Sequence, residues 1–270
     1  MLTHQGAAAP ATSSRPGEPV LLTVDVGNTN TVLGLFDGPE LFESYRIKTD
    51  PRVTADELAL MFRGLLADHP SPDGVAVCST VPAVLDQLNA MFLRYFADVP
   101  TVVVGPGVRT GVPLLTDNPR EVGPDRVVNT LAAHTLYGGP AVVVDFGTST
   151  NFDVVSARGE FLGGPLAPGI EISVDALAAR AARLFKVELV EPRAVIGKNT
   201  SEALQSGLVY GFAGQVDGLV RRIAAELGEQ PVVVATGGLS HLMFGVCEML
   251  DHHEPDLTLL GLRLVFEKNA

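Results

Sequence analysis

The sequence predicts an α/β fold built from two duplicated α/β domains. Strand-like apolar runs alternate along the chain with segments of helical periodicity, which is typical of this class. In addition, VDVGNTNT at 24–31 has a near-copy, VDFGTSTN, at 144–151. Each copy follows an apolar run and precedes a second one, so the pair indicates an internal duplication.

Short apolar runs bounded by polar or glycine-rich residues predict the strands. They lie at 20–24, 75–78, 101–104, 141–144 and 232–235, and the runs at 32–36 and 152–155 would return from each repeated loop as hairpins.

Helices are predicted where apolar residues recur on one helical face. Thr54 and Glu57 form a capping-box pattern ahead of the first helix. Further helical patterns span 82–96, 125–137 and 201–227, and Gly138 is a plausible stop for the second of these three.

The last helical segment carries a stripe of glycines on one face. They are Gly207, Gly211, Gly214 and Gly218. Each glycine costs about 1 kcal/mol relative to alanine in a helix interior, so the stripe needs a reason. Close packing against another element of the chain is favoured, and a contact between two copies in a dimer is the alternative.

Three segments are expected along the chain. Residues 1–19 are small, polar and proline-containing, without the pattern of a secretory signal, and predict a disordered tail. The first domain would span 20–119 and the second 120–270, with the glycine- and proline-rich stretch at 105–120 as the crossing.

Composition excludes several classes of function. A net charge of −12 argues against binding to nucleic acid or to an anionic membrane surface, and no apolar run is long enough to span a bilayer. Cys78 and Cys247 lie far apart without a CxxC motif, which favours a reducing cytoplasm. The six histidines show no zinc-binding spacing.

The two repeated loops predict phosphate binding. Asp25 and Asp145 would stand at strand ends, and Gly27 and Gly147 would let the backbone turn close to a ligand. The hydroxyl, amide and backbone N–H groups that follow suit phosphate oxygens, and a carboxylate suits a cation. One such loop is more often an ordinary turn, but two favour a nucleotide held between them, with Asp25 and Asp145 facing each other.

Three other motifs need weighing. ATGGLS at 235–240 follows a strand and, beside the two loops, favours a contact with adenosine. GKNT at 197–200 is not a P-loop, because Pro192 stands where that motif requires glycine. In GPDR at 123–126, Asp125 is either a helix cap or a base beside a carboxylate-binding Arg126, and spacing alone favours the cap.

Together these motifs resemble type III pantothenate kinase, in the superfamily of sugar kinases, actin and chaperone ATPases, whose domains are ribonuclease-H-like. The resemblance runs from about residue 20 to residue 269. It is carried by DVGNTNT at 25–31, DNPREVGPDR at 117–126, DFGTSTNFDVV at 145–155, GGPLAPGIEIS at 163–173, GKNTSEALQSG at 197–207, ATGGLS at 235–240 and the ending LTLLGLRLVFEKN.

The resemblance implies a role for each motif. ATP, with Mg²⁺, would be bound by Asp25, Val26, Gly27, Asn28, Thr29, Asn30, Thr31, Val32 and Thr148. Pantothenate would be bound by Gly123, Pro124, Asp125, Arg126 and Thr200, with Asp125 as the catalytic base. Asp145 would hold a monovalent cation, K⁺ or NH₄⁺. The resemblance also implies a homodimer with the active site near the subunit interface.

This sequence departs from the family at two positions. Pro124 stands where alanine is usual, and Thr116 stands where a tyrosine often lines the substrate pocket.

The leading expectation is therefore ATP-dependent phosphorylation of pantothenate to 4′-phosphopantothenate, the first step of coenzyme A biosynthesis. A non-catalytic regulator, of the kind described as Bvg accessory factor, is one alternative. A kinase of another small hydroxylated metabolite is the other.

Overall fold

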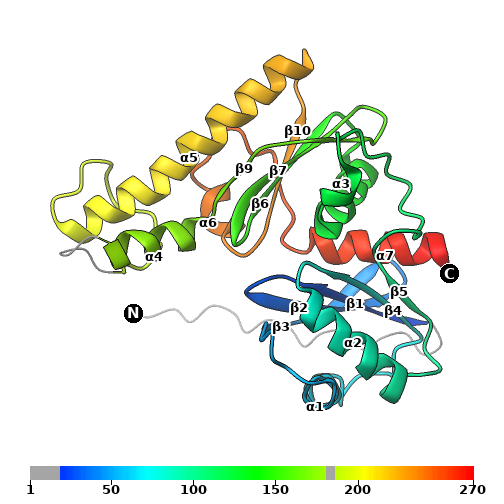
Figure 1. Ribbon diagram of the computed structural model, residues 1–270. Coiled ribbons are helices and arrows are strands. Elements are labelled where there is room, and N and C mark those ends of the chain that lie inside the picture. The colour runs from blue at the N-terminus through cyan, green and yellow to red at the C-terminus, as the bar shows by residue number, and fades with distance from the viewer. Residues whose placement is uncertain (1–18, 181–185) are drawn as a thin grey trace, which may run out of the picture. The chain divides into compact units, whose positions relative to one another are not determined.

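The computed structural model describes residues 19–180 and 186–270. They form two compact units, one of residues 19–108 with 265–270 and the other of residues 109–264, apart from the gap (Figure 1). The tail expected at 1–19 lies, except for Pro19, outside the described residues. The domain boundary at residue 119 and a nucleotide cleft between the domains stay predictions.

The first unit is built around a five-stranded sheet in the order β3-β2-β1-β4-β5. Strand β1 is antiparallel to β2 and parallel to β4. Along the chain the elements are β1 (Val20–Val26), β2 (Asn30–Asp37), β3 (Glu40–Lys48), α1 (Ala55–Leu65), β4 (Gly74–Ser79), α2 (Pro82–Tyr95) and β5 (Thr101–Val103).

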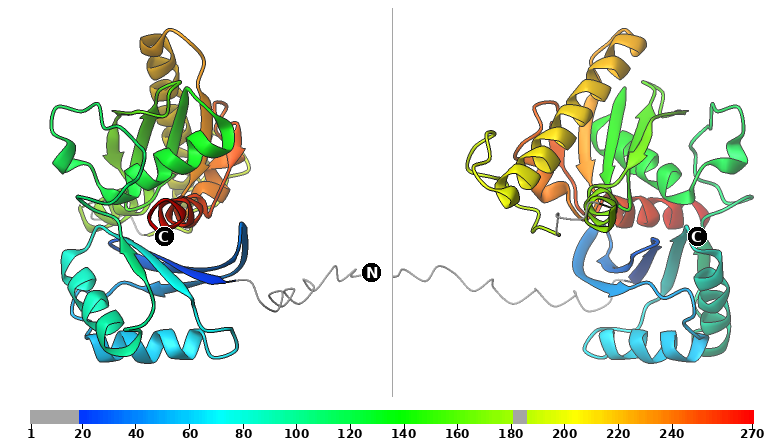
Figure 2. Two further views of the ribbon diagram at one scale, coloured as in Figure 1. Left: turned by 90° about the vertical axis from the view of Figure 1, so that its right-hand side faces the viewer. Right: turned by 60° about the vertical axis from the view of Figure 1, so that its left-hand side comes forward.

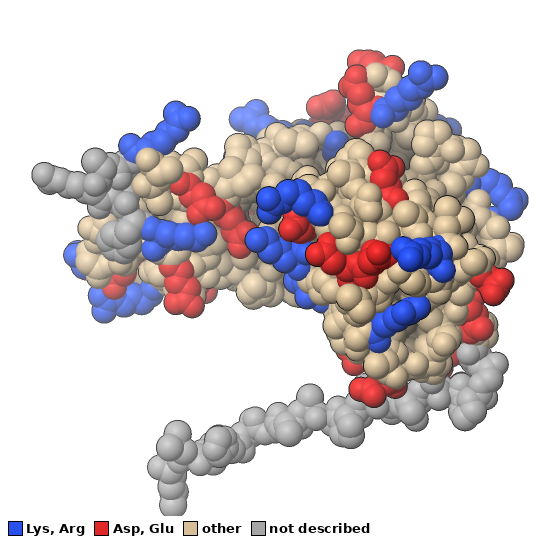
Figure 3. All heavy atoms as spheres, turned by 60° about the horizontal axis from the view of Figure 1, so that its bottom comes forward, with Lys and Arg blue, Asp and Glu red and all other residues tan. Residues whose placement is uncertain are grey.

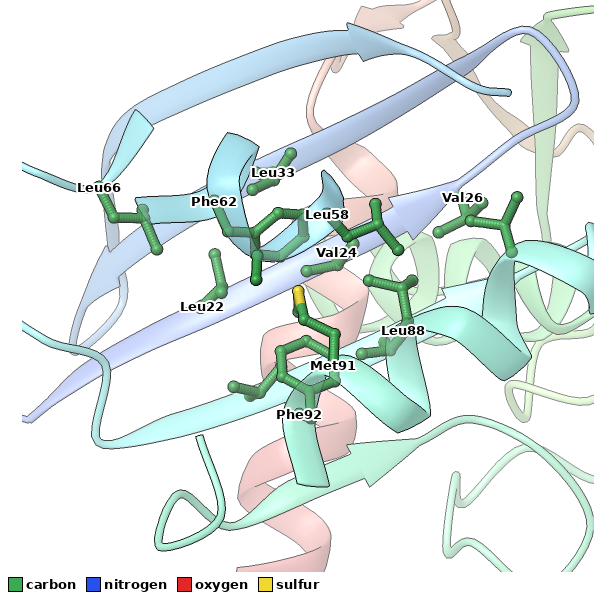
Figure 4. Packing of buried hydrophobic residues seen from close by; sticks show 14 of the residues in the cluster. Leu22, Val24, Val26, Leu33, Leu58, Phe62, Leu66, Leu88, Met91 and Phe92 are labelled. Carbon is green, nitrogen blue, oxygen red and sulfur yellow. The ribbon is translucent and has the colours of Figure 1, made fainter. Parts of the chain in front are cut away.

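Helices α1 and α2 cover one face of this sheet, and the hydrophobic core of the unit lies between them and the sheet. Leu22 and Val24 of β1 pack among Phe62 of α1 and Met91 of α2 (Figure 4). Successive side chains of a strand point to opposite faces, so Asp25 belongs to the other face. The predicted capping box is confirmed, because the Thr54 hydroxyl accepts from the backbone N–H of Glu57 at the start of α1.

The second unit repeats this plan with a sheet ordered β11-β10-β6-β7-β8, while β9 also pairs with β7. Its elements are the 3₁₀ turn η1 (Pro119–Glu121), α3 (Pro124–Tyr137), β6 (Ala141–Phe146), β7 (Ser149–Val155), β8 (Phe161–Gly163), β9 (Leu166–Pro168), α4 (Ile170–Arg180), α5 (Thr200–Leu227), β10 (Val232–Thr236), α6 (Ser240–Phe244) and β11 (His252–His253). The final helix α7 (Leu257–Asn269) begins in this unit, and its residues from Val265 onward belong to the first.

The internal duplication is confirmed by strand order and direction. In each unit the first strand lies between an antiparallel hairpin partner and a parallel strand, namely β2 and β4 around β1, and β7 and β10 around β6. The repeated Asp-x-Gly loops therefore occupy the same place in both units, the turn between the first two strands.

The helices of the second unit divide between the two faces of its sheet. Ala213 and Val216 of α5 pack with Val142 and Val144. Val143, with the opposite orientation, packs with α3. Asp145 lies two residues after Val143 on the same strand, so its side chain belongs to the same face of the sheet, the one that α3 covers.

The glycine stripe of α5 packs against no other element of the described residues, so the packing favoured above is wrong there. A Cβ atom added at Gly207, Gly211, Gly214 or Gly218 would have no atom of the described residues within 4 Å. Helix α5, yellow to orange in Figure 2, packs on its sheet through Ala213, Val216 and Val220 instead. None of the described helices is long and apolar enough to cross a membrane.

Candidate active site

The first Asp-x-Gly loop is a tight turn between β1 and β2. The Gly27 N–H donates to the carbonyl of Asn30 at 3.0 Å, and Asn28 and Thr29 are exposed at the tip. Backbone N–H groups and polar side chains at such a tip suit an anion.

Not every residue of this loop can offer its side chain to a ligand. Val26 is fully buried in the core, and the Thr31 hydroxyl is 2.9 Å from that of Thr49 inside the unit. These two residues could contact a nucleotide only through their backbone.

Asp25 has a partner that the sequence analysis missed. The Cys78 thiol donates to Asp25 Oδ1 at 3.2 Å, and Cys78 stands directly beside Asp25 in the register of β1 and β4. The only sequence signal was a cysteine at the end of the neighbouring predicted strand.

The second Asp-x-Gly loop is also a tight turn, between β6 and β7, and is one residue shorter than the first. The Gly147 N–H donates to the carbonyl of Ser149 at 3.0 Å, and Thr148 is exposed at the tip. The Thr148 carbonyl accepts from the N–H of Gly169 at 3.1 Å, just ahead of α4. A side chain at Gly169 would collide with that carbonyl, so this loop and the start of α4 are in close contact.

The ATGGLS motif lies against Asp145. Thr236, the last residue of β10, stands beside Asp145 in the sheet register. The backbone then turns at Gly237, with φ +91°, and a Cβ at that position would collide with Asp145 Oδ1 and with the backbone of Phe146. Two motifs that are far apart in the sequence thus form one surface at the carboxyl ends of β6 and β10.

The GPDR motif forms the amino end of α3. The N-cap is Gly123 and Pro124 is the first helical residue, a position that suits proline, so Asp125 is not the cap that its spacing favoured. Asp125 Oδ1 accepts from the backbone N–H of Arg126 at 2.9 Å. A side chain at Gly123 would collide with that carboxylate, which explains the glycine.

Burial controls the protonation of Asp125. It raises the pKa of this carboxyl above the usual range, against the opposing effect of the Arg126 N–H and guanidinium. A carboxylate that is costly to keep ionised accepts a proton more readily, as a general base requires.

Arg126 turns inward to a residue that the sequence analysis did not assign. Its Nε donates to Asp153 Oδ1 at 2.5 Å. Burial raises the pKa of Asp153 to about 7, with Arg126 opposing the shift and the nearby charge of Asp125 adding to it. The available signal was a charged residue inside an otherwise apolar run, FDVV at 152–155.

The predicted substrate residues are only partly brought together. Asp125 and Arg126 share one helix end. Thr200 is the first residue of α5, and among the residues that the structure describes no hydrogen bond or ion pair links it to either of them. The Thr116 hydroxyl is buried and has no hydrogen-bond partner among the described residues. Its methyl group would lie 3.8 Å from a Cβ added at Gly163.

Comparison with known proteins places this arrangement in a family. A model of the type III pantothenate kinase family matches residues 21–222. The type III pantothenate kinase of Frankia alni is 67% identical over 250 residues, which cover 93% of this chain and 100% of the relative.

Solved structures of low sequence identity share the fold. A Campylobacter jejuni protein described as a Baf family transcriptional activator has a TM-score of 0.60 at 18% identity, over 92% of this chain and 98% of its own. The ROK hexokinase of Thermus thermophilus has a TM-score of 0.51 at 16% identity, over 91% and 98%. The predicted fold class, two ribonuclease-H-like α/β domains, is confirmed. The family match and the relative at 67% identity show in addition that this chain, a kinase, belongs to the type III pantothenate kinase family.

Proposed function

We propose that this kinase transfers the γ-phosphoryl group of ATP to the primary hydroxyl of pantothenate, and that Asp125 accepts the hydroxyl proton. The products are 4′-phosphopantothenate and ADP, and the reaction is the first step of coenzyme A biosynthesis. The observation that carries the proposal is the amino end of α3, where a partly buried carboxylate of raised pKa adjoins an arginine. Such a pair can address both ends of a hydroxy acid.

The reaction asks mainly for positioning and charge stabilisation. The hydroxyl oxygen attacks the γ-phosphorus, its proton passes to Asp125, and the bond to the ADP oxygen breaks. Backbone N–H groups of the two Asp-x-Gly turns would hold phosphate oxygens, and the turn at Gly237 would lie against adenosine. A divalent metal bound with ATP supplies neutralising charge, and the carboxylates of Asp25 and Asp145 are hard oxygen donors that suit Mg²⁺.

The proposal is tested by ADP release in a coupled assay at high potassium. ADP formation should depend on added pantothenate. If ADP formed only with another small hydroxylated metabolite from a substrate panel, the chain would be a kinase of different specificity.

We propose that Asp145 also holds K⁺ or NH₄⁺. A carboxylate beside polyphosphate needs positive charge nearby, and the glycine at 237 keeps a side chain from colliding with Asp145 Oδ1. Asp145→Asn should lower kcat/KM for ATP by about 10²-fold, the scale of losing one charge-stabilising group. It should also remove the difference between K⁺ and Na⁺ buffers.

The exposed Asp86 of α2 provides the control, because Asp86→Asn removes the same charge elsewhere and should leave the kinetics unchanged. Full activity of the unsubstituted enzyme in sodium-only buffer would contradict the cation site.

The proposed homodimer would use the exposed glycine stripe of α5. A Cβ added at Gly211, which is exposed, would have no atom of the described residues within 4 Å, so Gly211→Leu should fold normally. It should nevertheless turn a dimer into a monomer in size-exclusion chromatography with light scattering. Gly64 of α1 is equally unobstructed, which makes Gly64→Leu the matched control. A Gly211→Leu dimer would exclude this face, and a monomeric parent protein would exclude the dimer.

A non-catalytic regulator is not favoured. Asp25, Asp125, Arg126 and Asp145 are all present, and the description of the Campylobacter jejuni protein as an activator belongs to that protein alone. On the face in Figure 3, acidic side chains lie among the basic ones. With the net charge of −12, this supports a protein that binds neither nucleic acid nor an anionic membrane. Two free cysteines support a cytoplasmic enzyme.

A further inference from the structure

Asp153 is a charged residue inside the core of the second unit. It lies in the middle of β7, between the buried Phe152 and Val154, and its side chain is 1% exposed. It stands beside Val143 in the sheet register, so it belongs to the face that α3 covers. There its carboxylate meets Arg126.

The bonding of this carboxylate is incomplete. Oδ1 accepts from Arg126 Nε at 2.5 Å, while Oδ2 has no hydrogen-bond partner among the described residues. Removing two opposite charges from water is costly, and apolar residues of similar volume often stabilise a fold as well or better. A gain in stability therefore explains this ion pair poorly. The better explanation is that the carboxylate of Asp153 sets the direction of the Arg126 side chain.

The inner edge of the guanidinium is fully used. Besides Nε, the Nη2 group donates to the carbonyl of Phe152 at 3.0 Å and approaches that of Gly164 at 3.5 Å. Gly164 has φ +142°, and a side chain there would collide with the Phe152 carbonyl. The guanidinium also lies over the ring of Phe161, at 5.0 Å from its centroid.

The Nη1 group remains available. It makes no hydrogen bond within the described part of the chain, and the Arg126 side chain keeps 17% exposure. Guanidinium N–H groups bind carboxylates, so an arginine held through Nε and Nη2 presents Nη1 in a set direction.

We infer that Asp153 is a positioning residue, which fixes Arg126 through Nε so that Nη1 receives the carboxylate of pantothenate. This inference rests on the proposed function, because it assumes that pantothenate is the substrate. Asp153 itself touches no substrate. Without it, Arg126 keeps its charge but loses its fixed orientation.

The test compares Asp153→Asn, Arg126→Ala and the double variant with the parent enzyme. For each, kcat and KM are measured for pantothenate, for its neutral amide analogue and for ATP, and thermal unfolding is followed in parallel. Asp153→Asn should raise KM for pantothenate by roughly 10- to 100-fold, the scale of one hydrogen bond to a charged group. It should leave kcat and KM for ATP close to the parent values.

Two controls separate positioning from general damage. The neutral amide has no carboxylate for Arg126 to bind, so Asp153→Asn should not change its KM. In the Arg126→Ala background, adding Asp153→Asn should have no further effect on KM for pantothenate, because the two residues act as one unit.

An unchanged KM for pantothenate in Asp153→Asn, or an equal rise for the amide, would overturn the inference. If Asp153→Asn does not fold, Asp153→Glu, which keeps the charge but displaces it, is put through the same comparison, and failure of both to fold would make Asp153 purely structural. Failure of the proposed function can be told apart from failure of this inference, because the parent enzyme itself would then form no ADP with pantothenate.

Discussion

Replacing Asp125 with asparagine is expected to lower kcat for pantothenate by roughly 10²–10⁴-fold, the usual contribution of a positioned acid–base group. Asparagine keeps the shape and can still accept the N–H of Arg126, but it cannot take a proton. Steady-state kinetics with varied ATP and pantothenate check this result. Turnover near that of the parent enzyme would remove Asp125 from its proposed role.

The pH dependence of the parent enzyme gives a second measurement on the same residue. Asp125 must be ionised to act as a base, and burial raises its pKa. The acid limb of kcat/KM for pantothenate should therefore lie above the ordinary aspartate value of about 3.9. Residual activity of Asp125→Asn should lack this limb.

Stability distinguishes lost chemistry from lost structure. A carboxyl with a raised pKa in the folded state contributes stability at low pH, and this contribution is lost as the pH rises through the folded-state pKa. Asp125→Asn removes the cost of ionising a buried group, so at pH 8 its melting temperature should equal or exceed that of the parent. A large fall in melting temperature would mean that the rate loss reflects unfolding.

Replacing Gly237 with alanine is expected to lower kcat/KM for ATP by roughly 10²-fold, the cost of a displacement of about 1 Å in a binding site. The added Cβ would collide with Asp145 Oδ1 and with the Phe146 backbone, and a left-handed conformation costs a non-glycine residue about 1–2 kcal/mol. The turn must therefore move away from β6.

Gly238 is the matched control for this substitution. It is exposed, and it does not share the positive φ of Gly237. Gly238→Ala should have a much smaller effect on kcat/KM for ATP and on the melting temperature, measured in the same way. If Gly237→Ala matched the parent protein in both quantities, the turn would have no part in nucleotide use.

Local patterns in the sequence predicted the duplication and many of the elements, but not β3, β8, β9, β11, α4 or α7. Hydrophobic periodicity, the capping box at Thr54 and the two Asp-x-Gly loops depend on neighbours within a few residues, and each appears in the structure as predicted. The family motifs also pointed to the helix end at Asp125, because that motif is a continuous run.

Tertiary structure decided what each side chain meets. The inward turn of Arg126 to Asp153, the contact of Gly237 with Asp145 and the exposure of the glycine stripe all join residues distant in sequence, or depend on what packs nearby. Periodicity reports which face of an element is apolar, but not which element covers that face. For this reason the sequence could name Asp125 and Arg126 as a pair, whereas only the packing of α3 on β7 showed that Arg126 is held by a buried carboxylate.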